Sequence, residues 1–224
     1  MCAGTADVVT TQPTVYIVDD DPQVRESLEL LMRSAGLNVE LFASAEDFLG
    51  QYHDDAGPPR CLVLDVRMSG LSGLGLQEKL AAMGTKIPII IITGYSNVST
   101  AVAAMSAGAV DFIEKPVSEQ TLLERISVAI DQDVQYRRQQ RRRAEIMAHF
   151  MTLSPREREV MELMVRGKQT KQIATRLKIG EKTVAKHRVR VFEKMGVDNV
   201  ASLVHMALVF QLIPTLKGIE IEGL

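Results

Sequence analysis

The stretch Cys61-Leu62-Val63-Leu64-Asp65 decides the fold, because four consecutive apolar residues end on a carboxylate. Such a run predicts a strand buried on both faces, as in a parallel sheet covered by helices. Three other largely apolar runs are also followed by polar residues: Val15–Val18 by Asp19 and Asp20, Ile89–Ile92 by Thr93, and Val110–Ile113 by Lys115. Parallel strands end at one edge of their sheet, where α/β folds bind ligands, so we expect these side chains to share a pocket.

Strands and helices alternate over the first part of the chain, which we assign to one domain, residues 13–130. We predict strands at 14–18, 38–42, 60–64, 88–92 and 110–113, and helices at Pro22–Ala35, 45–51, 72–82, 97–107 and from Ser118. Five such units favour an α/β fold with a doubly wound, five-stranded parallel sheet. Residues 1–12 are small and polar, and we expect them to be disordered.

The rest of the chain has only helical patterns. We predict a helical linker at 131–151 and an all-α domain at 152–213 with four helices, Pro155–Arg166, Thr170–Leu177, Glu181–Met195 and Asn199–Leu212. The linker contains five arginines between Arg137 and Arg143, which either contact phosphates or are simply solvated. Its apolar residues repeat too rarely to predict a coiled coil.

Charge divides the chain in the same way. Residues 1–130 contain 8 Lys and Arg against 17 Asp and Glu, a net charge of −9, whereas residues 131–224 contain 18 against 11, a net charge of +7. This difference predicts two domains with different partners, the second of which binds a polyanion. Two solvated surfaces with a chance bias in charge are the alternative.

Composition and cysteine content indicate where in the cell the protein is located. Hydrophobic residues make up 46% of the chain and charged residues 24%, which is typical of a globular protein. Cys2 and Cys61 imply no disulfide framework, so we expect a reducing, cytoplasmic location. The longest apolar run, near Ile87–Ile92, is too short to cross a bilayer, and no signal-peptide pattern is present. We therefore expect no membrane association.

The residues expected in the pocket suit Mg²⁺ and a phosphoryl group. Mg²⁺ prefers a few carboxylate oxygens with water and phosphate completing an octahedron. Asp20 and Asp65 would be direct ligands, and Asp19 would lie nearby. The remaining roles fall to the backbone carbonyl of Arg67 as a further ligand, the Lys115 ammonium on phosphoryl oxygens and the Thr93 hydroxyl as a donor to one of them. Each residue alone has an ordinary structural explanation, and the combination carries the prediction.

This combination resembles bacterial response-regulator receiver domains, whose fold is flavodoxin-like, over residues 13–130. The resemblance implies that Asp65 is the phosphoacceptor, that Asp19 and Asp20 hold Mg²⁺, and that Lys115 binds the phosphoryl group. It further implies a switch through Thr93 and Phe112 and a cis peptide bond before Pro116. One departure is Ser69, where the family commonly has proline. Gly73-Leu74-Gly75 could suggest nucleotide binding, but turn and helix-entry glycines explain it better.

A basic face is predicted on the helix Glu181–Met195. Lys182, Lys186, Arg190 and Lys194 recur every four residues and share this face with Thr183 and His187. The preceding helix and the tight turn Lys178-Ile179-Gly180 complete a helix-turn-helix pattern. A helix that enters the major groove of DNA needs such a face, although a solvated basic helix is the alternative.

The segments Leu153–Val160, Lys171–Ala174 and Thr183–His187 resemble the LuxR-type helix-turn-helix domain. Together with the receiver pattern they resemble FixJ-type transcriptional regulators. The resemblance implies that Thr183 and His187 lie near phosphates, that Lys186 and Arg190 face the groove, and that the last helix dimerises, with packing on its own domain as the alternative. We also expect Lys171 and Lys182 to belong to the DNA-binding surface. The family usually has Lys where Ala185 stands, and Gln169-Thr170 replaces its Ser-Asn pair. One residue is about 100° around a helix, so these departures bear on the base contacts.

The sequence thus predicts a DNA-binding response regulator of a two-component system that is not an enzyme acting on an external substrate. We expect a sensor histidine kinase to phosphorylate Asp65, followed by formation of a homodimer and binding to double-stranded promoter DNA, with RNA polymerase as a possible further partner. A regulator that ignores phosphorylation is the main alternative. An aspartyl-phosphate enzyme is disfavoured because Arg67 stands where such enzymes often carry a second aspartate.

Overall fold

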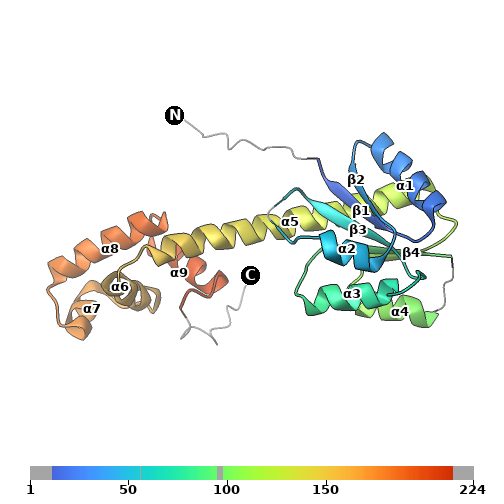
Figure 1. The fold of residues 1–224 in the computed structure, drawn as a ribbon. Coiled ribbons are helices and arrows are strands. Elements are labelled where there is room, and N and C mark those ends of the chain that lie inside the picture. Colours follow the sequence, from blue (N-terminus) through green and yellow to red (C-terminus); the bar gives the residue numbers. More distant parts are fainter. Residues whose placement is uncertain (1–11, 56, 95–97, 214–224) are drawn as a thin grey trace. The chain divides into compact units, whose positions relative to one another are not determined.

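The computed structural model describes residues 12–55, 57–94 and 98–213 (Figure 1). The chain divides into two compact units, residues 1–138 and 139–224. The expected disorder of residues 1–12 falls, apart from Gln12, outside the described residues, as does the start of the helix predicted at 97–107. In the part of the chain that is described, no helix is both long enough and apolar enough to cross a bilayer.

The first unit contains a five-stranded sheet in which all neighbouring strands are parallel. Its strands are β1 (Thr14–Val18), β2 (Asn38–Phe42), β3 (Arg60–Asp65), β4 (Ile89–Thr93) and β5 (Asp111–Glu114). Their order is β2-β1-β3-β4-β5, which confirms the predicted doubly wound sheet. The order reverses between β1 and β3, so the switch point lies where Asp19 follows β1 and Asp65 ends β3.

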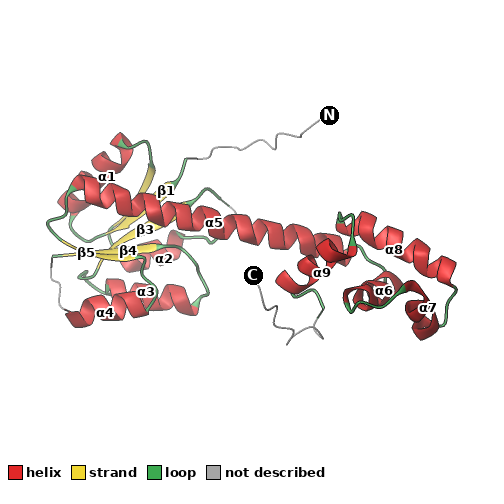
Figure 2. Ribbon diagram, turned by 180° about the vertical axis from the view of Figure 1, so that it is seen from behind, coloured by secondary structure: helices red, strands yellow, loops and turns green. Residues whose placement is uncertain are grey.

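Helices cover both faces of this sheet. They are α1 (Pro22–Ser34), α2 (Ala45–Gln51), α3 (Gly73–Ala82), α4 (Val98–Ser106) and α5 (Glu119–Met151). Figure 2 shows α1 and α5 on one face and α2, α3 and α4 on the other. Met32 of α1 and Ile126 of α5 pack with Val63 and Ile90 in one core, whereas Phe48 of α2 packs with Leu64 in the second. Cores on both faces explain why β3 and β4 are buried along their whole length.

The second unit is a helical domain that includes the end of α5. Its other helices are α6 (Pro155–Val165), α7 (Thr170–Leu177), α8 (Glu181–Met195) and α9 (Val200–Val209). Ile146 from α5 is buried in its core with Val160, Val184 and Leu203. The predicted last helix was three residues too long, because the backbone leaves the helix after Val209 and reaches a φ of +50° at Gln211.

No break separates the two units along α5. The helix runs from Glu119 to Met151 through the segment predicted as a helical linker. Ser118 accepts a hydrogen bond from the backbone N–H of Thr121 at 3.1 Å, which caps its start as its sequence predicts. The first unit ends at Arg138, eight residues beyond the predicted domain end.

Candidate phosphoryl pocket and DNA-binding helix

Four strands deliver polar residues to one edge of the sheet. Asp19 follows β1, Asp65 ends β3 and Thr93 ends β4, and these three residues are 4%, 7% and 1% exposed. Lys115 comes directly after β5, and its backbone N–H donates to the carbonyl of Thr93 at 2.8 Å. Polar groups at four adjacent strand ends, of which Asp19, Asp65 and Thr93 are buried and Lys115 is half-buried, form one pocket at the predicted edge of the sheet.

The Lys115 ammonium joins the two buried carboxylates of the pocket. Its Nζ lies 2.8 Å from Asp19 Oδ2 and 2.9 Å from Asp65 Oδ1. Burial raises the pKa of Asp65 above its ordinary value, and the hydrogen bond from Lys115 opposes this rise without cancelling it. Burial lowers the pKa of Lys115, but the hydrogen bonds that Lys115 donates to Asp19 and Asp65 give a net upward shift. Lys115 is therefore a permanent cation between two acids.

Backbone amides hold the remaining carboxylate oxygens. Asp65 Oδ2 accepts from the Arg67 N–H at 2.6 Å, and Asp19 Oδ1 accepts from the Asp21 N–H at 2.9 Å. Asp20 is exposed, and its Oδ2 accepts from the Ser69 N–H at 2.9 Å. Ser69 is the position where the sequence departs from the receiver pattern, and a proline there could not make this bond because it has no N–H.

The chemistry of these oxygens fits Mg²⁺, although they do not form a preformed coordination site. The described residues contain no group of three or more His, Cys, Asp and Glu side chains that could together hold a metal ion. Asp19 Oδ2 and Asp65 Oδ1 are instead bonded to Lys115, and Asp20 lies at the exposed rim. Carboxylate and carbonyl oxygens are nevertheless the ligands that Mg²⁺ takes, and this ion usually keeps several waters. Receiver domains generally bind Mg²⁺ in such an acidic pocket.

The two residues expected to report phosphorylation lie on neighbouring strands. Thr93 is buried at the end of β4, and Phe112 lies on β5, where it pairs with Ile91 and is half-buried. The Lys115–Pro116 peptide bond is cis. Phe112 packs against the core beside α2, α3 and α4, so a change at Thr93 could reach the face that contains α4.

Gly73 allows the pocket to form, because its backbone passes close to Asp65. A Cβ built on Gly73 would lie 2.1 Å from the backbone oxygen of Asp65, and the Gly73 N–H donates to the Val66 carbonyl at 3.0 Å. Any side chain would displace backbone at the phosphoacceptor candidate. Gly73 therefore serves packing at the entry to α3, and the Gly73-Leu74-Gly75 stretch needs no bound nucleotide to explain it.

Replacing Gly73 with alanine should destabilise the protein by roughly 2–3 kcal/mol, since the added methyl group must push apart two backbone segments. The matched control is Gly50→Ala in α2, where an added Cβ meets nothing within 4 Å. Alanine is the better helix former, so this control should be neutral or stabilising. Urea unfolding followed by circular dichroism measures both, and equal midpoints for the two variants would contradict the packing argument.

A basic face on α8 is the second candidate site. Lys182, Thr183, Lys186 and Arg190 are exposed, as is Lys171 on α7. His187 is half-buried, and its Nδ1 has no hydrogen-bond partner among the described residues. Val184 and Val191 are buried on the opposite face of α8, so the basic residues point away from the core. The turn before α8 contains Lys178 with a φ of +55°, which ends α7 in the left-handed conformation.

Lys194 does not belong to this exposed face, which corrects the prediction made from its spacing. Its Nζ lies 2.7 Å from Glu157 Oε2 and 3.0 Å from the Thr152 carbonyl oxygen, so it ties α8 to the start of α6. The Ser154 backbone N–H also donates to Glu157 Oε2 at 2.9 Å. The hydrogen bond from Lys194, followed by that from Ser154, lowers the pKa of Glu157 to about 2. Lys194 is thus a structural residue.

This pairing should make the helical domain sensitive to acid. The pKa of Glu157 lies below its ordinary value of 4.5, so its contribution to stability is complete above that pH and is lost as the pH falls toward 2. Because the Lys194 side chain is 37% exposed, solvent screens the pair, and we expect it to contribute about 1–2 kcal/mol. We expect Glu157→Gln to lower the urea midpoint at pH 7 and to have little effect near pH 2. Glu159→Gln is the control, because its exposed pair with Arg156 should contribute little. Equal losses in both variants would contradict this assignment.

The fold and the two sites together define a class of protein: a receiver-type α/β domain followed by a helix-turn-helix DNA-binding domain. Comparison with known families agrees for both parts. Residues 15–127 match the response regulator receiver domain, and residues 151–207 match the luxR family of bacterial regulatory proteins. The chain belongs to the response regulators that carry a LuxR-type DNA-binding domain.

Individual relatives align over nearly the whole chain. Nodulation protein W of Bradyrhizobium diazoefficiens is 43% identical over 198 residues, which cover 88% of this chain and 86% of that protein. The transcriptional regulatory protein FixJ of Azorhizobium caulinodans is 40% identical over 203 residues, which cover 89% and 94%. Among solved structures, the response regulator StyR matches with a TM-score of 0.81 at 41% identity, over 89% of this chain and all of that one. These relatives are transcriptional response regulators. A receiver domain implies a sensor kinase as partner, and a LuxR-type domain implies DNA binding.

Proposed function

We propose that this protein switches promoter binding by α8 through phosphorylation of Asp65. A sensor histidine kinase supplies the phosphoryl group, and the phosphorylated protein forms a homodimer that binds double-stranded promoter DNA in the cytoplasm and contacts RNA polymerase there. The observation that carries the proposal is the position of the Lys115 ammonium, within 3 Å of both Asp19 and Asp65 at a buried edge of the sheet.

The pocket suits an in-line transfer to a carboxylate. One oxygen of Asp65 forms a bond to phosphorus while the bond between phosphorus and the histidine nitrogen of the kinase breaks, and the imidazole leaves with the electron pair. The product is an acyl phosphate. Lys115 then exchanges its bond to Asp65 for one to the phosphoryl oxygens, because a cation stabilises the charge that spreads over them. Thr93, at the end of the adjacent strand, donates its hydroxyl to one of these oxygens.

Mg²⁺ would supply the positive charge that the transferring oxygens need beyond that of Lys115. Asp19, Asp20 and Asp65 would hold it with the backbone carbonyl of Arg67. Asp20 already lies at the rim and is the most accessible of the three carboxylates. The acyl phosphate then hydrolyses slowly at Asp65, so the protein resets itself without being an enzyme for an external substrate.

Exposed apolar side chains on α4 support the proposed dimerisation. Val98, Val102 and Met105 are 81%, 58% and 47% exposed, and their helical spacing places them in a stripe on one face of α4. Phe112 packs against the core that also holds Ala104 of α4, so the switch residues lie next to this surface. Phosphorylation would reshape the stripe and bring two copies together. In the helical domain α9 carries a further exposed valine, Val209, which suits pairing of the two DNA-binding domains.

The chemistry of the modification is tested by incubating the protein with ³²P-labelled acetyl phosphate. We expect a label that requires Mg²⁺, is lost when EDTA removes the metal, and is released by hydroxylamine, which cleaves acyl phosphates. A label that forms equally well in EDTA, or that resists hydroxylamine, would contradict the proposal.

A further inference from the structure

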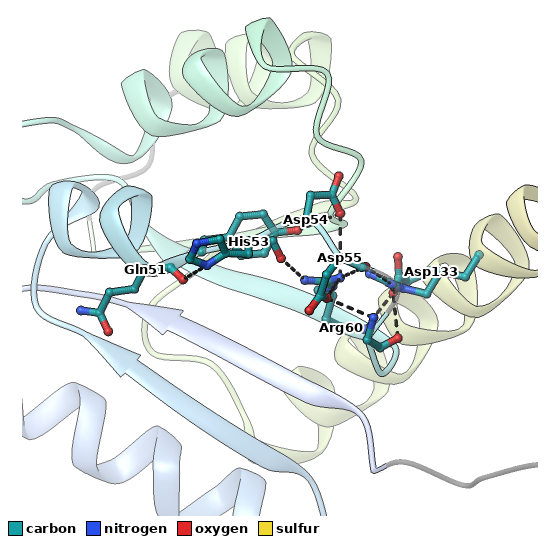
Figure 3. Close-up of polar contacts among 9 residues, drawn as sticks. Gln51, His53, Asp54, Asp55, Arg60 and Asp133 are labelled. Carbon is teal, nitrogen blue, oxygen red and sulfur yellow. Dashed lines mark hydrogen bonds and ion pairs between the residues drawn. The ribbon is translucent and has the colours of Figure 1, made fainter.

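A second polar cluster lies where β3 begins, at the end of that strand opposite Asp65 (Figure 3). Its centre is Arg60, whose side chain is only 3% exposed. The guanidinium donates to the carbonyl of His53 at 2.8 Å and to both the carbonyl and the carboxylate of Asp55. It also lies 5.3 Å from the centre of the Tyr52 ring. Arg60 thus fixes the loop between α2 and β3 from inside.

The same cluster reaches α5 through Asp133, which is 2% exposed. Asp133 Oδ2 accepts the backbone N–H of Arg60 at 2.9 Å and the Nε–H of Arg137, one turn further along α5. Arg137 Nη1 in turn donates to the carbonyls of Asp55 at 3.0 Å and Gly57 at 3.3 Å. The Asp133 carboxylate therefore accepts hydrogen bonds both from the start of β3 and from α5.

Apolar packing contributes little to holding residues 131–137 of α5 against the first unit. Ile126, Ala129 and Ile130 are buried against the sheet, but Val134 and Tyr136 are 37% and 39% exposed. A cavity of about 320 Å³ lies beside Asp133 and Tyr136 and is also lined by Gln77, Leu80 and Val110. The polar contacts of Asp133 and Arg137 are therefore the main attachment of residues 131–137 to the first unit.

We propose that Arg60, Asp133 and Arg137 form a clasp that makes residues 131–137 of α5 part of the rigid receiver domain. Without the clasp, α5 would be free to bend or fray just after Ile130. With it, a displacement of α5 inside the receiver is carried into the linker. This second consequence rests on the proposed function, whereas the clasp itself does not.

The clasp is tested by amide hydrogen exchange on the full chain. In Asp133→Ala the buried N–H of Arg60 loses its acceptor and should exchange at least about tenfold faster, whereas Asp133→Asn keeps an acceptor oxygen and should retain much of the protection. Unchanged exchange at Arg60 in Asp133→Ala would overturn the assignment. Amides of β4 report whether the sheet remains folded.

A milder pair of variants avoids the buried carboxylate. Arg137→Met keeps the aliphatic stem and removes the ionic contacts, and we expect residues 131–138 to exchange about tenfold faster. Arg138→Met is the matched control, since Arg138 is exposed and lies next in the chain. Equal exchange in the two variants would overturn the clasp.

The consequence for signalling needs a separate readout, the ratio of promoter affinities with and without acetyl phosphate. We expect this ratio to fall severalfold in Arg137→Met and to stay at the wild-type value in Arg138→Met. Faster exchange with an unchanged ratio would overturn the role in transmission and leave a structural clasp. Because exchange is measured without phosphorylation, failure of the proposed function cannot be mistaken for failure of the clasp.

Discussion

Asp65→Asn should abolish phosphorylation by acetyl phosphate. The amide that replaces the carboxylate is no nucleophile toward phosphorus, so no acyl phosphate can form at position 65. The fold should survive, because burial raises the pKa of Asp65 and the charged group is itself unfavourable there. Incorporation of ³²P, measured after gel separation, gives the result.

The control for this variant is Asp47→Asn, an exposed aspartate in the first turn of α2. It removes the same charge from the same domain and should be labelled like the wild type. Label that persists in Asp65→Asn at the wild-type level would mean that another residue accepts the phosphoryl group. The assignment of Asp65 as the phosphoacceptor would then be wrong.

Replacing both Lys186 and Arg190 with alanine should weaken promoter binding by about 2–4 kcal/mol in total. An arginine that reads guanine contributes about 1–3 kcal/mol, and a lysine on a phosphate adds a smaller amount that does not depend on sequence. Both side chains are exposed on α8, opposite the buried Val184 and Val191, so their loss should leave the core intact. Affinity is best measured by fluorescence anisotropy at fixed salt, because phosphate contacts make it strongly salt-dependent.

Lys79→Ala with Lys86→Ala is the matched control for α8, because it removes two exposed positive charges from the receiver domain instead. A general electrostatic effect would weaken binding equally in both double variants. Binding by α8 predicts a large loss only in the Lys186 and Arg190 variant. If promoter footprints of that variant match the wild type, α8 does not bind the promoter.

The convergence of the pocket residues could be predicted from the sequence because a parallel sheet leaves few choices. Once Val15–Val18, Cys61–Leu64 and Ile89–Ile92 are recognised as buried parallel strands, their following residues must meet at one edge. The exact partners could not be predicted. Which oxygen pairs with Lys115 depends on side-chain rotamers and on the amides of Asp21 and Arg67, and no sequence spacing encodes these.

Helical spacing was reliable for the buried side of α8 and less so for its charges. Lys186 and Arg190 are exposed as the four-residue repeat predicts, but Lys194, the next in the repeat, bonds to Glu157 on α6. A long flexible side chain near a helix end can bond to a carboxylate within its reach, even where helical spacing predicts that it is exposed. The alternation of apolar and charged residues gave no sign of this tertiary contact.

The contact between β3 and α5 was not predicted from the sequence. The bond from the Arg60 N–H to Asp133 spans 73 residues, and no spacing in the sequence connects the two residues. Ile146 likewise gave no signal that the end of α5 completes the second core, because the arginine-rich stretch before it hides its periodicity.

Promoter affinity measured on one preparation, with and without acetyl phosphate and Mg²⁺, tests the central claim most directly. If Asp65 controls α8, acetyl phosphate should raise the affinity of the wild type by about tenfold or more and leave Asp65→Asn unchanged. Equal affinities of the wild type in both conditions would contradict the account and favour a regulator that binds DNA regardless of phosphorylation.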